Sequence, residues 1–395
     1  MDFSEIELDT EHAALLSEIR AFVKEHITDE VRQYEIETGH GFNEKVHLAL
    51  GERGWIMPQW PRDRGGAGMD PLGIYLLTRE LARAKMPFPT VSTTRLAVTA
   101  VEQFGSPEIK EDVLRGVADG TVRISLGYTE PHGGSDVAMS RTRAVRDGNE
   151  WVINGAKMFT TGAQHTQYCF LIARSDPSLP KHKGLSMFLV PLDLPGIEIQ
   201  PIRAFSGERT NMVFYDDVRV PERYLLGEPN GGWTVLRGPL DAEHGGRRDV
   251  SQGLQELSMA ASFIQEVHEG FETVLDWADA SGLVGPALLE RLGRLAMEMD
   301  ASLATPGPAG RIKGGETTVW AGAEMLDILG PEGLIDFGRS DALGGGVAEF
   351  VNRFAQGTIT YGGSVEVFRT IIAQHELGLP RMEYPGSRAF VTTAS

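Results

Sequence analysis

The sequence of 395 residues has one cysteine, fewer basic than acidic residues, and no long apolar run. Cys169 has no possible disulfide partner within the chain, and its neighbours form an apolar run, so we expect a buried structural thiol. The formal net charge of −18, with no basic cluster, argues against a nucleic-acid partner. Because no stretch of about 18 apolar residues occurs, we expect no membrane span. The N-terminus is acidic rather than basic and apolar, which predicts a cytoplasmic protein without a secretory signal.

Helical and strand-like patterns occupy different parts of the chain. Apolar residues recur at helical spacing in four early segments, whereas short β-type runs separated by turn residues begin at Val122. The expected helices cover residues 9–25, 44–50, 72–84 and 96–104, and the expected strands cover 151–153, 168–173, 187–190, 212–214 and 218–220.

The helical period returns after Trp233, with a glycine-rich local loop at 342–347. The order of helices, strands and helices predicts an α+β fold with segregated layers. We expect a helical domain at 1–120, a β domain at 121–233 and a second helical domain at 234–395. Two late helices are expected. The first has one apolar face, formed by Phe263, Val267, Phe271, Val274 and Leu275, and the second is suggested by Leu288, Leu289, Leu292, Leu295 and Met297.

Two segments rich in glycine and threonine, residues 127–136 and 154–163, lie in the middle third of the chain. Gly133 and Gly134 allow backbone N–H groups to approach an anion closely, and hydroxyl groups follow nearby. Each segment adjoins a strand-like run. The pattern indicates a site for a flat, polar and phosphorylated ligand, although such residues also serve as plain turns between strands.

The residues that match a known family extend over most of the chain. They are Tyr-Thr-Glu-Pro at 128–131, Gly-Ser-Asp at 134–136, Gly155 with Lys157 and Thr161, the glycine-rich loop at 54–68, and the segments 214–221 and 226–233. In this order they resemble the acyl-CoA dehydrogenase family. The resemblance implies a helical domain, a β-barrel and a four-helix bundle. It also implies FAD-dependent oxidation of acyl-CoA to 2,3-enoyl-CoA in β-oxidation, with an electron-transfer flavoprotein or similar acceptor.

The same resemblance assigns the cofactor site. Tyr128, Thr129 and Ser135 are expected to line the flavin and pyrophosphate, Phe159 to pack by the isoalloxazine, and Thr161 to hydrogen-bond near N5. Backbone and hydroxyl donors suit a flavin whose reduced form gains negative charge. The complete expected set of cofactor-binding residues is Tyr128, Thr129, Gly134, Ser135, Phe159, Thr161, Ser364 and Glu366.

The catalytic base occupies one of two places in the family. In many members it is the Glu of a Tyr-Glu-Gly-Thr stretch, but here residues 361–364 read Tyr-Gly-Gly-Ser and Gly362 stands at that position. Other branches place it in a Leu-Asp-x-Glu segment after the barrel, which residues 240–243 match. Glu243 is therefore the candidate base, and a solvated helix glutamate is the alternative. A base of this kind needs a dry pocket that raises its pKa.

Glycines near the reacting carbons suggest the kind of acyl group. Gly362, Gly245 and Gly246 would leave room for a bulky or branched substrate, such as a steroid side-chain CoA thioester. Glycines also serve close helix crossings, so the sequence leaves both interpretations open.

Two further segments depart from the family in a way that concerns the neighbouring subunit. In homotetrameric members a neighbour supplies Arg-x-x-Phe-Gly and Gln-x-x-Gly-Gly to the FAD. Here residues 281–285 begin with Ser281 in place of Arg, and 327–331 carry Asp327 and Pro331 in place of Gln and Gly. A carboxylate beside a pyrophosphate is unfavourable, and proline removes a donor. This resembles heterotetrameric α2β2 members that act on steroid side-chain thioesters, with a homologous partner subunit and two FADs.

Two other functions remain open at this point. The chain is alternatively a non-catalytic scaffold subunit of such a complex, with its activity in the partner. A flavin oxidase or monooxygenase on the same fold is the third interpretation.

Overall fold

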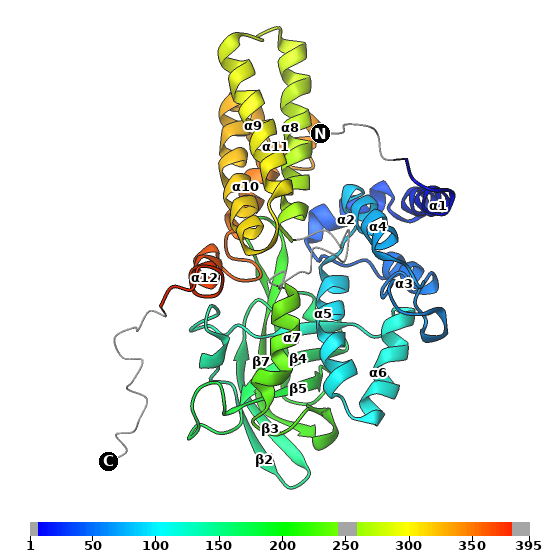
Figure 1. Cartoon of the computed structure of the whole chain (residues 1–395), viewed down its shortest axis with the longest axis vertical. Coiled ribbons are helices and arrows are strands. Elements are labelled where there is room, and N and C mark those ends of the chain that lie inside the picture. Colours follow the sequence, from blue (N-terminus) through cyan, green and yellow to red (C-terminus); the bar gives the residue numbers. More distant parts are fainter. Residues whose placement is uncertain (1–6, 244–258, 381–395) are drawn as a thin grey trace.

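The computed structural model describes residues 7–243 and 259–380, without the side chains of 241–243 and 259–261 (Figure 1). N-terminal helices flank a sheet. A bundle of long helices projects beyond the sheet, at the opposite end of the molecule from β2 and β3 (residues 143–157). This α+β arrangement confirms the fold class expected from the sequence. No helix in these two ranges is long and apolar enough to cross a membrane.

The N-terminal helices begin at side chains that cap them. Asp9, Asn43, Asp70 and Ser106 each accept a hydrogen bond from an amide of the first turn, which satisfies one otherwise free donor. The helices are α1 Thr10–His26, α2 Asp29–Thr38, α3 Glu44–Glu52, α4 Pro71–Arg83, α5 Pro89–Phe104 and α6 Pro107–Asp119. The predicted helix at 96–104 was too short, because α5 starts at Pro89 with a polar first half.

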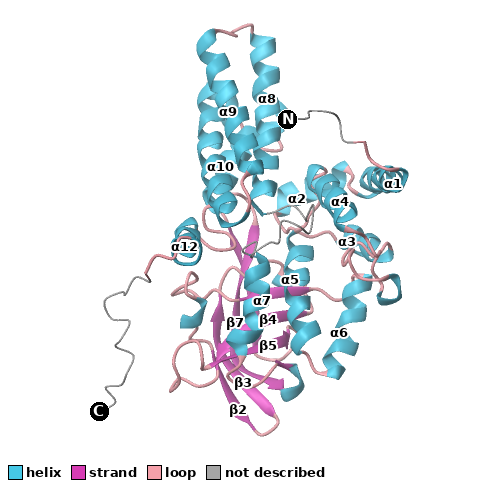
Figure 2. Cartoon of the chain, viewed as in Figure 1, coloured by secondary structure: helices cyan, strands magenta, loops and turns pink. Residues whose placement is uncertain are grey.

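The middle of the chain forms one mixed sheet of eight strands (Figure 2). Its order is β6-β7-β3-β2-β4-β5-β8, and β1 pairs with β4 in parallel. Cys169 on β4 is fully buried, as expected of a structural thiol. The strands are β1 Ile124–Gly127, β2 Arg143–Asp147, β3 Glu150–Lys157, β4 Tyr168–Arg174, β5 Leu185–Pro191, β6 Ile197–Arg203, β7 Arg209–Pro221 and β8 Leu225–Leu226.

The separate strands predicted at 212–214 and 218–220 were wrong, because both belong to the long strand β7. The Asp216-Asp217 pair between them has the composition of a turn, and Asp217 does adopt a positive φ of 48°. Asn154 of β3 bridges this irregularity: its amide donates to Asp217 Oδ1 at 2.9 Å, and its oxygen accepts from the Asp217 amide at 2.9 Å. The pairing of β3 with β7 shifts at the same point, so this is a bulge inside a strand.

The C-terminal part contains α7 Gly232–Glu243, α8 Met259–Ser281, α9 Pro286–Ala304, α10 Gly307–Leu329, α11 Val347–Thr358 and α12 Val365–Ile371. Helices α8 to α11 share a second core. The two late helices expected from the sequence are α8 and α9, although Leu275, Leu289 and Met297 on them are 41%, 56% and 59% exposed. Helix α10 escaped prediction because glycine and threonine fill its buried faces. At Gly322 an added Cβ would lie 2.9 Å from Asn352 Cα, so α10 and α11 cross too closely for a larger residue.

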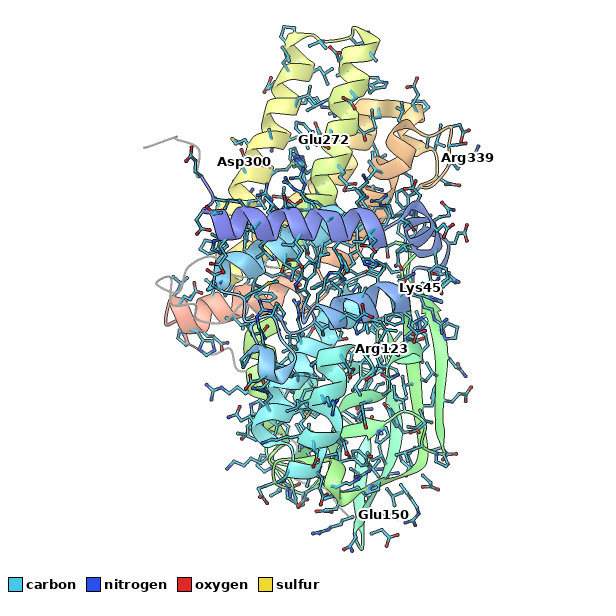
Figure 3. The ribbon with its side chains drawn as sticks, turned by 90° about the vertical axis from the view of Figure 1, so that its right-hand side faces the viewer. Lys45, Arg123, Glu150, Glu272, Asp300 and Arg339 are labelled. Atoms are coloured by element: carbon cyan, nitrogen blue, oxygen red, sulfur yellow. The ribbon has the colours of Figure 1, made fainter. Side chains whose placement is uncertain are left out.

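Arg123 joins the N-terminal helices to the sheet (Figure 3). Its guanidinium donates to the carbonyl groups of His165 and Gly120 at 2.7 and 3.1 Å, and lies over the Phe42 ring at 4.9 Å. Figure 3 also shows Glu150, on β3, at the opposite end of the molecule from Glu272 on α8. The sheet therefore packs against the N-terminal helices at one side while the helix pair α8–α9 extends away from it.

Glu35 on α2 provides a test of this junction. Burial raises the pKa of Glu35 to about 7, with the nearby charge of Glu208 acting in the same direction and the Gly41 amide opposing both. Because this folded-state pKa exceeds the ordinary 4.5, the contribution to stability is complete below about pH 4.5 and is lost as pH rises through 7. Glu35→Gln should therefore gain roughly 1–3 kcal/mol of stability relative to wild type at pH 8 but not at pH 4.5. Urea unfolding at both values measures this, and an equal shift in the control Glu37→Gln, an exposed position on α2, would contradict it.

Candidate functional site

The two glycine- and threonine-rich segments lie side by side where β1 and β3 end. The Met158 amide donates to the Thr129 carbonyl at 2.8 Å. The Lys157 ammonium donates to the Tyr128 carbonyl at 3.4 Å and to Glu130 Oε1 at 2.7 Å. The structure thus brings together two parts of the chain that the sequence analysis assigned to one site.

A buried ion pair holds this junction together. Glu130 and Lys157 are 3% and 0% exposed. Ser140 Oγ and the Thr142 amide also donate to Glu130, at 2.5 and 2.9 Å, and the Arg141 amide adds a bond of 2.7 Å. Burial raises the pKa of Glu130, but the charge of Lys157 and these hydrogen bonds outweigh it and lower the pKa to about 2. The sequence analysis included both residues in the family motifs but did not predict that they form an ion pair.

The turn at 129–136 offers backbone donors. An added Cβ on Gly134 would lie 2.9 Å from Thr129 Cγ2, so a larger residue there would have to displace the Thr129 side chain. The amides of Gly134 and Ser135 donate no hydrogen bond to any described residue, and Ser135 is exposed. These two amides are available to an anion.

Phe159 presents its ring outward from the second segment. Its φ is 59°, in the left-handed region that non-glycine residues rarely adopt, and its side chain is 54% exposed. The next residue is fixed from both sides, because the Thr160 amide donates to the Asn211 carbonyl at 3.0 Å and Asn211 Nδ2 donates back to the Thr160 carbonyl at 3.0 Å. Strain of this kind is typical of functional positions.

Thr161 continues the same edge toward β7, where its hydroxyl lies 3.1 Å from that of Thr210. Two further polar atoms of this loop, Thr160 Oγ1 and Gln164 Nε2, are buried and have no hydrogen-bond partner in the part of the chain that is described. Amide donors, hydroxyl groups, an outward aromatic ring and unsatisfied polar atoms together form a donor set that fits a flavin nucleotide.

The two expected cofactor residues near the C-terminus lie at the start of α12, Ser364 as its N-cap and Glu366 within the helix. The Ser364 hydroxyl caps this helix by accepting from the Val367 amide at 3.4 Å. Glu366 is exposed, and Arg369 at 3.8 Å lies near enough to pair with it. No hydrogen bond of the described residues joins either side chain to the segments of the sheet. The adjoining Tyr361 makes a link instead, because its hydroxyl donates to Glu208 Oε2 at 2.7 Å on the β6–β7 connection.

The candidate base lies at the end of α7, which packs beside α5 and β5 (Figure 1). The helix ends at Glu243, whose side chain lies outside the described part of the structure, as do Gly245 and Gly246. At the alternative place for a base, Gly362 has a φ of 56°. That backbone conformation gives an independent reason for glycine there.

The two segments expected to differ from homotetrameric relatives lie on the helical bundle. Ser281 ends α8, and residues 282–285 form the tip between α8 and α9, far from the sheet (Figure 1). Asp327 near the end of α10 accepts from Arg291 Nη2 at 2.7 Å, and Glu324 accepts from Arg291 Nε at 2.5 Å. Asp327 therefore takes part in an ion-pair network on the bundle of its own chain.

Comparisons with known proteins agree with this arrangement. Residues 9–121 match the N-terminal domain and residues 125–218 the middle domain of acyl-CoA dehydrogenases. Acyl-CoA dehydrogenase FadE26 of Mycobacterium tuberculosis is 30% identical over 93% of this chain and 96% of its own length. Acyl-CoA dehydrogenase IpdE1 of the same organism is 31% identical over 93% of this chain and 98% of its own.

Solved structures give the same result. The steroid ACAD Tcur3481-Tcur3483 matches with a TM-score of 0.83 and 31% identity, over 97% of this chain and all of that one. The ChsE4-ChsE5 complex from Mycobacterium tuberculosis matches with a TM-score of 0.79 and 28% identity, over 96% of this chain and all of that one. Because both domain matches and relatives of 30% and 31% identity extend over most of the sequence, the chain belongs to the acyl-CoA dehydrogenase family and is an oxidoreductase of that type.

Proposed function

We propose that this chain is the base-carrying subunit of an FAD-dependent acyl-CoA dehydrogenase that acts on a bulky or branched acyl-CoA in the cytoplasm. The observation that supports this most directly is the junction of residues 127–136 and 154–163, where free amides, hydroxyl groups and the outward ring of Phe159 share one edge. In this proposal the domains are 1–120, 121–233 and 234–395.

Each group of the chain has a distinct task in the reaction. The amides of Gly134 and Ser135 bind the pyrophosphate, while Phe159 packs against the flat ring system and Thr161 donates near its reactive edge. Ser364 and Glu366 approach the cofactor from the start of α12. Glu243 removes the α proton of the thioester as general base. FAD held by these residues would supply the acceptor for the β hydride, and a protein such as an electron-transfer flavoprotein would then take the electrons.

The acyl group in this proposal is a steroid side-chain thioester. Tcur3481-Tcur3483 is described as a steroid ACAD and matches this chain at 31% identity. The glycine at 362, where many family members have a carboxylate, agrees with a wide acyl site.

A homologous partner chain completes the cofactor site in our proposal. Ser281 and Asp327 stand where homotetrameric relatives supply Arg and Gln to a neighbour, and Asp327 already pairs with Arg291. The tip of α8 and α9 lies far from the sheet of its own chain, where only a neighbour could use it (Figure 1). ChsE4-ChsE5, a complex of two named chains, matches over 96% of this sequence.

Co-expression with a family-related partner tests the proposal. We expect a yellow complex that oxidises branched or steroid acyl-CoA only when both chains are present, because the described neighbour segments lack a cationic group for the pyrophosphate. The FAD-to-protein ratio and enoyl-CoA formation are the measurements. A soluble, FAD-saturated and active homotetramer of this chain alone would exclude the mixed assembly. Rapid reaction of the reduced enzyme with O2 would favour the oxidase or monooxygenase alternative.

Phe159→Ala tests the flavin contact. Because the ring is largely exposed, its loss should change the free energy of unfolding of the FAD-free protein by less than about 1 kcal/mol. The Kd for FAD in the complex should rise about threefold to tenfold through lost stacking. Fluorescence titration with FAD measures the Kd. Phe205→Ala is the control, because this ring on the β6–β7 connection is 70% exposed, and an equal effect of the two variants would contradict the assignment.

A further inference from the structure

Arg311 on α10 is a buried cation in contact with the turn that precedes α12. The residue is only 6% exposed. Its guanidinium carbon lies 5.2 Å from the Phe263 ring on α8 and 5.5 Å from the Phe368 ring on α12. Its Nη2 donates to the Tyr361 carbonyl at 2.5 Å and lies 3.3 Å from the Gly363 carbonyl. One side chain therefore contacts two carbonyl groups of a four-residue turn from within the protein.

The direction of these carbonyl groups determines the direction of the following amides. The described chain contains no cis peptide bond, and in a trans peptide the C=O and N–H point in opposite directions. Since Arg311 holds the carbonyl groups of Tyr361 and Gly363, the N–H groups of Gly362 and Ser364 point away from the guanidinium. Neither amide donates a hydrogen bond to any described residue, and both residues are half-buried.

The turn is also held from the side of the sheet. The Tyr361 hydroxyl donates to Glu208 Oε2 at 2.7 Å, and Ser206 Oγ donates to the same oxygen at 2.7 Å. Gly362 and Gly363 have φ values of 56° and 98°. These backbone angles allow the carbonyl groups of Tyr361 and Gly363 to point to the same side, toward Arg311. Because Arg311 and Glu208 hold the turn from different domains, its two free amides have little freedom to reorient.

We propose that Arg311 is a positioning residue that aims the amides of Gly362 and Ser364 at the thioester carbonyl oxygen of the substrate. This inference rests on the proposed function. When the α C–H bond breaks, its proton goes to the Glu243 carboxylate and its electron pair moves toward that oxygen. An oxidised FAD held at this site would supply the acceptor for the β hydrogen, which would leave the substrate as hydride and give the enoyl-CoA product. Donors fixed before the reaction stabilise the charge on the oxygen without reorganisation, and the buried guanidinium polarises the peptides that carry them.

Arg311→Lys in the co-expressed holoenzyme tests this role. Lysine keeps the charge but loses the planar fork that holds two carbonyl groups. We expect kcat to fall about 10- to 100-fold with KM changed less than threefold, because the charge develops only in the transition state. The long-wavelength absorbance of the complex with a 3-thia-acyl-CoA, which forms an enolate but cannot be oxidised, should weaken in parallel. FAD content should match wild type.

Two further variants keep the test decisive. Gly315→Ala adds a Cβ 3.0 Å from Arg311 Nη1 without removing the charge, and should lower kcat in the same direction by a smaller factor. Arg291→Lys, on α9 and paired with Glu324, is the control and should leave kcat and the enolate band unchanged. Should Arg311→Lys fail to fold, the Gly315→Ala result decides.

The outcomes separate this inference from the function on which it rests. If the wild-type complex does not oxidise acyl-CoA, the proposed function fails. If wild type is active but Arg311→Lys and Gly315→Ala keep its kcat and enolate absorbance, the function stands and the role of Arg311 is overturned. A loss of FAD or of folding in proportion to activity would mean that Arg311 acts only through structure.

Discussion

Glu243→Gln in the co-expressed complex should lower kcat by about 10²- to 10⁴-fold while FAD remains bound. Glutamine has nearly the same shape as glutamate but cannot accept a proton, so the α C–H bond would have no base. The residue ends α7, whose buried Val235 and Leu236 attach the helix to the rest of the subunit. Anaerobic reduction of the flavin by substrate, followed by stopped-flow absorbance, measures the chemical step directly.

Asp241→Asn is the matched control, because it removes the other carboxylate of the Leu-Asp-x-Glu segment. We expect Asp241→Asn to keep more than about a tenth of wild-type kcat, because the proposed base Glu243 is still present in this variant. Unchanged flavin reduction in Glu243→Gln would reject this residue as the base and favour the scaffold alternative, in which the partner chain performs the chemistry.

Local patterns predicted the parts of the fold that depend on neighbouring residues in sequence. The helices at 9–25 and 44–50 and the strand at 168–173 agree with α1, α3 and β4 to within two residues at each end. Helices α1 and α3 have apolar residues at helical spacing and a capping side chain at the start, and β4 is a short continuous apolar run. Helix α10 lacks such a pattern because its contacts with α8, α9 and α11 leave little exposed surface, so only the packed structure identifies it.

In the candidate site, too, short motifs predicted some features while others became visible only in the structure. The sequence analysis predicted Thr129, Gly134, Phe159 and Thr161 as cofactor-binding residues through their motifs. The structure places the two segments that carry them side by side, and their role stays a prediction. The sequence did not reveal that Lys157 lies within hydrogen-bond distance of Glu130, because the two are 27 residues apart and charged residues are normally exposed. Contacts of this kind depend on strand register, which short motifs do not contain.

Arg311 illustrates the same limit at longer range. It donates to a carbonyl 50 residues away, on a turn whose Gly362 was interpreted from the sequence either as room for a large acyl group or as a close helix crossing. The positive φ values of Gly362 and Gly363 show that the backbone itself requires these glycines. A sequence alone cannot distinguish glycine that leaves volume from glycine that permits a turn.

Lys157→Met should destabilise the FAD-free protein by about 3–5 kcal/mol, because it leaves the Glu130 carboxylate buried without its cation. Methionine fills most of the space of the lysine stem, so the loss reports the charge rather than a cavity. Urea unfolding at pH 7 measures the effect. Lys181→Met is the control, since its pair with Asp136 at 2.5 Å is about half exposed and should contribute less than about 1 kcal/mol.

The pH dependence gives this prediction a direction that can be checked separately. The folded-state pKa of Glu130 is about 2, below the ordinary 4.5, so its stabilising contribution is complete above about pH 4.5 and is lost as pH falls toward 2. Lys157→Met should flatten that part of the curve, and the double variant Lys157→Met with Glu130→Gln should recover part of the stability at pH 7, since no unpaired charge then remains. If Lys157→Met proved as stable as wild type at pH 7, the ion pair would not hold the two segments together, and the site they form would need another source of rigidity.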